Sequence, residues 1–154
     1  MQKLKEFAVI LLCCAIATSG QGNSFDKVRY NGGSVDSKVG PKDWQNHLTV
    51  TSDMITLALK DGKKLELPPK SVNSLSYGQE AHRRVADMVA LSLVATPLAL
   101  FGILHQSKTH FIGIEYRTGD GKPGALLLEA DKNNYRAILR ALEVVTGKPV
   151  KNAP

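Results

Sequence analysis

Thiols and aromatic rings are scarce in this 154-residue chain. Its two cysteines, Cys13 and Cys14, both lie in the apolar segment Met1–Gly22, and aromatic residues make up 6% of the sequence. Removal of that segment would leave no thiol, which excludes a disulfide, a thiolate nucleophile and a cysteine-metal site. Basic residues without interleaved exposed aromatic residues also argue against nucleic acid as a partner.

Motifs that would indicate catalysis or a bound cofactor are scarce as well. The sequence has no G-x-S-x-G elbow and no glutamate pair whose spacing favours acid–base work. Gly119–Gly124 does match G-x-G-x-x-G. However, a strand rather than a helix is expected after it, and Pro123 has no N–H, so we interpret it as a hairpin turn. We therefore predict a protein that has no cofactor and is not an enzyme.

The histidines do not form a recognisable ligand set. They lack cysteine partners and an organised carboxylate cluster, so no metal site is predicted. The alternative is a catalytic site that assembles only in three dimensions, from two of these histidines and nearby carboxylates. The histidines are His47, His82, His105 and His110, and those of the alternative site are His47 and His110.

The N-terminal segment 1–22 is typical of a secretory signal peptide. Lys3 and Lys5 precede the apolar core Phe7–Ala17, and small residues follow it. We expect cleavage between Ala17 and Gly22, and hence a periplasmic or extracellular protein. An uncleaved N-terminal anchor is the alternative.

The longest apolar run after the N-terminus is Val85–Leu104, which carries one charge, Asp87. Its length is borderline for a membrane-spanning helix, which needs about 20 apolar residues. Pro97 interrupts it, and a complete crossing would place the strands predicted on its two sides in different compartments. We therefore favour a helical insertion, residues 80–106, that embeds in a membrane or packs on the protein, with a complete span as the alternative. The residues predicted to contact a membrane or a partner are Arg83, Arg84, Leu98, Leu100, Phe101 and Lys108.

Alternating apolar residues predict an antiparallel meander with one buried and one wet face. Asp61-Gly62 and the Gly119–Gly124 segment have the composition of hairpin turns. A first strand is expected to end at Asn31, and Pro68-Pro69 is expected to interrupt the ladder. The predicted strands are 25–30, 47–51, 55–59, 63–67, 72–77, 110–116 and 125–130, with a helix beginning near 79–90.

The last segment predicts an amphipathic helix, because apolar residues recur every three or four positions from Tyr135 to Val145. Asp131 or Asn133 is expected to cap its start, and Gly147 to end it. A basic ridge is predicted beside its apolar stripe, formed by Lys132, Arg136 and Arg140.

The order of these elements resembles the pleckstrin-homology-like (PH-like) superfold, which includes GRAM-like and bacterial branches. The stretches that carry the resemblance are HLTVTSDMITLALKDGKKLELPPKSVNSLSYG and HFIGIEYRTGDGKPGALLLEADKNNYRAILRALEVVTGKPV. The sequence also resembles exported bacterial proteins with the order RRV, PLALFG, HFIGIEY and LEVVTGKPV. The resemblance implies a partly open antiparallel barrel with a C-terminal capping helix. It does not imply phosphoinositide binding, because only Lys27 and Arg29 lie near the first predicted hairpin.

The sequence thus predicts an α+β protein with a single PH-like domain over residues 25–150 and the apolar helical insertion. Its net charge of +6 favours an acidic neighbour. We expect a non-catalytic module that binds a membrane surface or a protein partner. The alternative is a soluble periplasmic domain with an internal apolar helix that binds a protein along a sheet edge.

Overall fold

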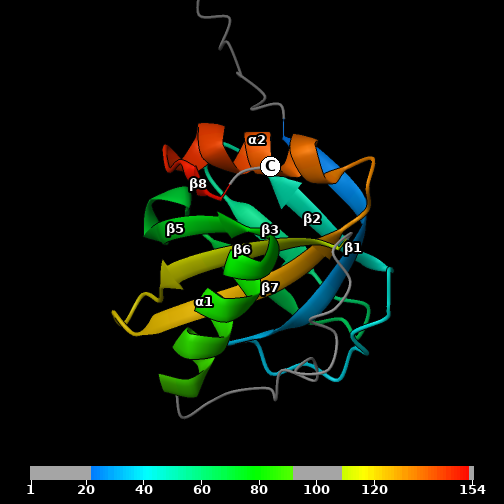
Figure 1. Cartoon of the computed structure of the whole chain (residues 1–154), viewed down its shortest axis with the longest axis horizontal. Helices are drawn as coiled ribbons and strands as arrows, with labels where there is room; N and C mark the ends of the chain where they lie inside the picture. The colour runs from blue at the N-terminus through cyan, green and yellow to red at the C-terminus, as the bar shows by residue number, and fades with distance from the viewer. Residues whose placement is uncertain (1–21, 92–108, 153–154) are drawn as a thin grey trace, which may run out of the picture.

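The computed structural model describes residues 22–91 and 109–152 of the chain. Eight strands form one sheet in the order β4-β3-β2-β1-β7-β6-β5-β8. All neighbours are antiparallel except β5 and β8. Figure 1 shows the sheet curving around a core that α2 covers at one end. The elements are β1 (Asn23–Gly33), β2 (Asn46–Val50), β3 (Ile55–Ala58), β4 (Lys64–Leu67), η1 (Pro69–Ser71), β5 (Val72–Tyr77), α1 (Gly78–Leu91), β6 (His110–Arg117), β7 (Pro123–Ala130), α2 (Tyr135–Thr146) and β8 (Val150–Lys151).

The predicted meander is present, and its alternation places the core. Leu48 and Val50 of β2 are buried, as are Ile55 and Leu57 of β3, while the residues between them are partly exposed. The predicted hairpin turn is present: residues 118–122 join β6 to β7, with positive φ at Gly121, and Pro123 and Gly124 already belong to β7. These strands and α2 enclose the main core of the molecule.

The first strand is longer than predicted. It does not end at Asn31 but continues to Gly33, because Gly32 and Gly33 pair with Leu127 and Leu126 of β7. A Cβ atom on Gly33 would lie 2.2 Å from the Ala125 carbonyl oxygen, so the close approach of the two strands requires glycine there.

The start of α2 also differs from the prediction. The N-cap residue is Asn134, and its side chain makes no capping hydrogen bond. The Asp131 carbonyl instead accepts the N–H groups of Asn134 and Tyr135, and the Asp131 carboxylate accepts the N–H of Asn133. Asp131 therefore stabilises the turn before α2, and neither Asp131 nor Asn133 is the N-cap residue. At the other end Gly147 adopts the left-handed conformation and closes the helix, as predicted.

The expectation of one wet face is wrong for β6 and β7. Helix α1 lies across their outer face and forms a second, smaller apolar cluster there. A Cβ atom on Gly113 of β6 would lie 3.2 Å from the Cα of Ala81, so the helix sits directly on the strand. Adjacent residues of β7, such as Leu127 and Leu128, are therefore both fully buried.

Strands β5 and β6 are neighbours in the sheet although the run Val85–Leu104 separates them in sequence. The part of the run up to Leu91 is the end of α1, and the rest lies outside the described residues. Both flanks of the run therefore belong to one folded body. Within the described ranges, no helix is both long and apolar enough to cross a membrane.

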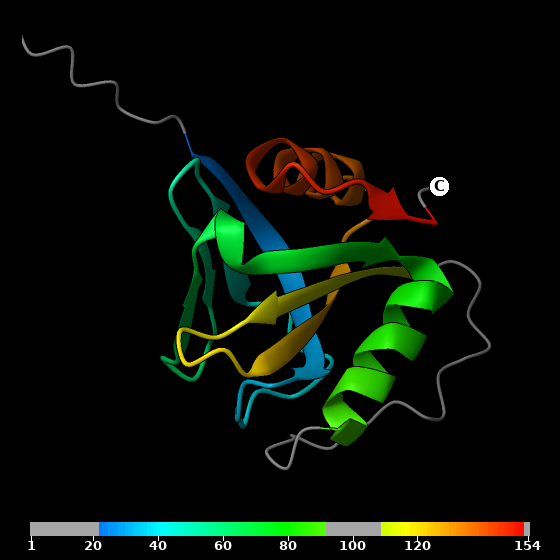
Figure 2. The same ribbon diagram turned by 90° about the vertical axis from the view of Figure 1, so that its left-hand side faces the viewer.

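Helices α1 and α2 lie at opposite ends of this body. Figures 1 and 2 are related by rotation about the vertical axis, and in both α2 is at the top and α1 is at the bottom. Asn23 therefore lies at the α2 end of the body, whereas Leu91 lies at the far end.

Candidate binding groove

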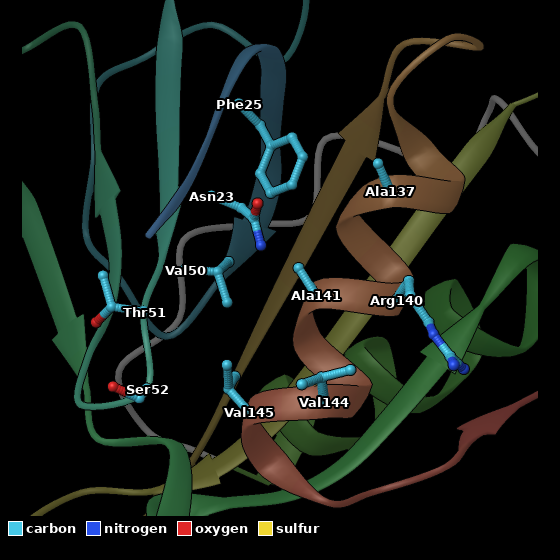
Figure 3. Close-up of a pocket in the computed structure, with 10 residues that line it drawn as sticks. All are labelled: Asn23, Phe25, Val50, Thr51, Ser52, Ala137, Arg140, Ala141, Val144 and Val145. Carbon is cyan, nitrogen blue, oxygen red and sulfur yellow. The ribbon is translucent and has the colours of Figure 1, made fainter. Parts of the chain in front are cut away.

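A groove opens between α2 and the ends of β1 and β2. Its volume is about 510 Å³, which is within the range of small-molecule and peptide pockets. Phe25 and Val50 line the strand side, and Ala141 and Val145 project toward them from the helix (Figure 3). The groove is lined by Asn23, Phe25, Val50, Thr51, Ser52, Ala137, Arg140, Ala141, Val144 and Val145.

The helix side of the groove is unusually apolar for a surface. Val144 is 69% exposed and is the one large hydrophobic residue with an exposed side chain in the described part of the chain. Ala137 is exposed two helical turns before it, and the small side chains of Ala137 and Ala141 keep the groove open. An exposed valine beside an open apolar groove indicates a surface that a partner can cover.

A positive charge stands at the outer rim of the groove. Arg140 leaves α2 on the flank beyond Val144, and its side chain is 79% exposed (Figure 3). Its ion pair with Glu143 is 3.9 Å long, so the guanidinium keeps most of its hydrogen-bonding capacity. The arrangement can hold an apolar group in the groove and an anionic group at its rim.

A Ser–His–Asp hydrogen-bond chain lies on the outer face of β1 and β2. The Ser24 hydroxyl is 2.5 Å from His47 Nε2, and His47 Nδ1 is 2.5 Å from the Asp26 carboxylate. A nucleophilic triad uses these same contacts, but it also needs a buried carboxylate and donors for an oxyanion. Here the Asp26 side chain is 82% exposed, and the three side chains lie on a solvent-exposed strand surface. We interpret it as a surface hydrogen-bond cluster that rigidifies the start of β1.

The two arginines that precede the apolar run have different environments. Arg84 donates two hydrogen bonds to the buried carboxylate of Glu115 on β6. The hydrogen bonds and charge of Glu115 raise the pKa of the Arg84 guanidinium. Arg83 is exposed and pairs with Glu80 one turn away. Sequence reasoning grouped the two arginines, and only the fold reveals that one of them anchors α1 to the sheet.

Several polar atoms are buried near this ion pair. The hydroxyls of Ser74 and Ser76 and the Nε2 atom of His82 have no hydrogen-bond partner among the described residues. Burial lowers the pKa of His82, which packs against Phe111. We interpret these buried polar atoms as a determinant of the stability of the α1 side.

The remaining predicted site residues are scattered. Arg136 and Arg140 are exposed on α2, whereas Lys132 lies in the turn before the helix, so the three do not form one helical ridge. His47 and His110 lie in different clusters, since His110 stacks on Tyr135 at 3.8 Å. In the described part of the chain no three histidine, cysteine or acidic residues gather as metal ligands. The residues that lie outside it are Leu98, Leu100, Phe101, His105 and Lys108.

Sequence reasoning missed the groove as a site. Of its apolar residues, Val145 was assigned to the helix stripe and Val50 to the strand alternation, and the two were not connected. The one signal available was Val144, an apolar residue that lies outside the stripe of buried positions.

Comparison with known proteins identifies the fold. No family model matches the sequence, and no curated protein matches it. The structure is similar to the C-terminal phosphotyrosine interaction domain of APBB2 from mouse, with a TM-score of 0.52 and 13% identity over 86% of this chain and 91% of that domain. A chain of the Spt16D–Pob3N heterodimer is also similar, with a TM-score of 0.48 and 10% identity over 84% of this chain, which spans 53% of that chain. The similarity to the mouse domain shows a PH-like fold, as the order of elements predicted.

Proposed function

We propose that this protein is an exported, non-catalytic binding module whose ligand site is the groove between β1, β2 and α2. The observation that carries the proposal is the open apolar groove with Val144 exposed at its mouth. Burial of such a surface by a partner is favourable by about 25 cal/mol per Å² of apolar area. The ligand class that fits is the apolar part of a protein or peptide.

The fold relative supports a binding role without defining the ligand. The mouse domain is named for interaction with phosphotyrosine, and fold alone does not transfer that ligand. The groove here has apolar walls and one arginine at its rim, which favours aliphatic groups.

The proposed groove can be tested with a display library of short random peptides panned against the purified protein. The blocking variant is Ala137→Phe, which fills the groove from an exposed helix position. The matched control is Gln79→Phe, at an exposed position of α1 at the other end of the body. Enriched peptides should bind the Ala137→Phe variant at least tenfold more weakly and the control as tightly as wild type. Equal binding to all three proteins would place the ligand site elsewhere.

The export component rests on the N-terminal sequence. N-terminal sequencing of the protein recovered outside the cytoplasm should begin between residues 18 and 23. Retention in the cytoplasm with Met1 intact would refute export.

Membrane association through Val85–Leu104 is the second candidate function. The pairing of β5 with β6 brings both flanks of the run to one body, which argues against a complete crossing and is compatible with embedding. Arg84 is engaged by Glu115, which leaves Arg83 and Lys108 as the cations for lipid headgroups. In liposome flotation with anionic lipid, the Leu98→Asp/Phe101→Asp double variant should remain in the soluble fraction while wild type floats. Equal flotation of the two proteins would refute this candidate.

A further inference from the structure

The backbone direction of β2 follows from the turn at its end. The Thr51 N–H donates to the Met54 carbonyl, which makes these two residues a hydrogen-bonded pair of the β2–β3 ladder. In an antiparallel ladder, alternate residues direct their backbone groups to opposite neighbours. Leu48 and Val50 therefore direct their N–H and carbonyl groups away from β3 and toward β1.

The same alternation fixes the first half of β1. Asn23 and Phe25 pair with Val50 and Leu48, so their backbone groups are used by β2. The backbone groups of Ser24 and Asp26 must then point to the other side of the strand.

One hydrogen bond on that other side agrees with this direction. The Asp26 carbonyl accepts a hydrogen bond from the side chain of Asn134, at the start of α2. The side of β1 that faces away from β2 is thus the side on which α2 lies.

This side of β1 is an open sheet edge. Strand β7 pairs with β1 only from Val28 onward, and the positive φ of Lys27 lies at a register shift in β1 just before that point. No neighbouring strand of the described residues reaches the N–H and carbonyl of Ser24 or the N–H of Asp26. The open edge runs beside the groove, because Asn23 and Phe25 of the same stretch line it.

We propose, on the basis of the function proposed above, that the ligand is an extended polypeptide segment that adds a strand to this open edge of β1. Backbone donors and acceptors on an exposed strand edge can pair with the backbone of an added segment, which favours a polypeptide over a lipid. Residues two apart in an added strand point to the same face, so aliphatic side chains at alternate positions enter the groove. Arg140 at the outer rim favours an acidic residue next to the aliphatic pair.

Substitution of Ser24 tests the backbone component directly. Ser24→Pro removes the N–H that points to the open edge and leaves the β1–β2 ladder intact, since β2 does not use that group. Ser24→Ala retains the N–H and removes the hydroxyl contact with His47, so it is the matched control. We expect library-selected peptides to bind Ser24→Pro about tenfold more weakly and Ser24→Ala within about twofold of wild type. A melting temperature close to that of Ser24→Ala would show that the proline variant is folded.

Amide exchange provides a readout that does not depend on a variant. In the free protein the amides of Ser24 and Asp26 should exchange faster than those of Asn23 and Phe25, which β2 protects. Addition of a selected peptide should slow exchange at Ser24 and Asp26. Unchanged exchange at these two amides, together with full binding by Ser24→Pro, would overturn strand addition.

Charge reversal tests the acidic component. Arg140→Glu should weaken binding of acidic selected peptides about tenfold and reduce the salt dependence of binding. Lys42→Glu, an equal charge change in the loop between β1 and β2, should change binding less than about twofold. Peptides without any acidic residue, or an equal effect of the two variants, would overturn this component.

The outcomes separate the two levels of the proposal. Loss of binding in Ala137→Phe with full binding in Ser24→Pro retains the groove and refutes the added strand. Full binding in Ala137→Phe refutes the groove itself. An empty peptide selection combined with flotation on anionic vesicles that Ala137→Phe abolishes would assign the groove to lipid. A concentration-dependent dimer that the same variant dissociates would assign it to a second copy of the chain. Either result would overturn the proposed ligand.

Discussion

The two helices cover the sheet in different ways. On the inner face, α2 seals a large core of aliphatic residues and leaves an apolar groove open at its edge. On the outer face, α1 covers a small cluster that is bordered by an ion pair and by buried polar atoms that have no hydrogen-bond partner among the described residues. The α2 side therefore combines a large apolar core with an exposed apolar surface, whereas on the α1 side an ion pair helps to hold the helix on the sheet. The apolar residues exposed at the groove are not needed to fill the core, which makes the α2 side the better candidate for a ligand site.

Substitution of two adjacent leucines of β7 compares the stabilities of the two cores most directly. Leu128 faces the large core and Leu127 the α1 cluster, and both are fully buried. Large-to-small core substitutions cost about 2–5 kcal/mol, and the cost rises when the surroundings cannot collapse. We expect about 4 kcal/mol for Leu128→Ala and about 2–3 kcal/mol for Leu127→Ala in urea unfolding, because α1 can settle toward the sheet. A larger loss for Leu127→Ala would reverse the comparison.

The two arginines of α1 separate the anchoring ion pair from a surface pair. Glu115 is 7% exposed, so removal of its partner in Arg84→Ala leaves a buried carboxylate unpaired. Such losses cost about 3–5 kcal/mol for fully buried pairs, and partial exposure of Arg84 reduces our expectation to about 2–3 kcal/mol. Arg83→Ala, which removes an exposed pair with Glu80, should cost less than about 1 kcal/mol. Equal losses in chemical denaturation would show that Arg84 does not anchor α1.

The buried histidine should make the α1 side sensitive to acid. Burial lowers the pKa of His82 below its ordinary value of 6.5, so the unfolded chain binds a proton before the folded protein does. Stability is then full above about pH 6.5 and falls as the pH decreases below that value. In His82→Leu this contribution is absent, so wild type should lose stability relative to the variant as the pH is lowered from 7 to 5. Parallel pH profiles of the two proteins in thermal unfolding would contradict this expectation.

The smallest effect on stability is expected at the mouth of the groove. Val144→Thr keeps the shape of the side chain at a position that is 69% exposed, so unfolding should change by less than about 0.5 kcal/mol. Binding of selected peptides should nevertheless weaken, because the hydroxyl enters an apolar contact. A stability loss above 1 kcal/mol would mean that Val144 belongs to the core rather than to a ligand site.

Local sequence patterns predicted most helices and strands, whereas contacts between residues far apart in the sequence could not be predicted. The alternation at Leu48 and Val50 and the stripe of α2 depend on neighbours two to four residues away, so the sequence displays them directly. The Arg84–Glu115 ion pair joins residues 31 positions apart, and the groove joins β1 to α2. No local period encodes such contacts. The two-sided burial of β7 did leave a signal in its continuous apolar run, which is typical of a strand covered on both faces.

The pairing of β1 also determines how early in synthesis the sheet can form. Arg29 of this strand forms an ion pair with Glu129, 100 positions later in the chain. The neighbour of β1 on that side exists only after nearly all of the polypeptide has emerged, and such distant closure slows folding. A nascent chain that ends at α1 therefore has unpaired backbone groups along one whole margin of β1, and these groups can pair with other strands. Most of that margin is later covered by β7, and the part that remains is the start of the strand, beside the groove.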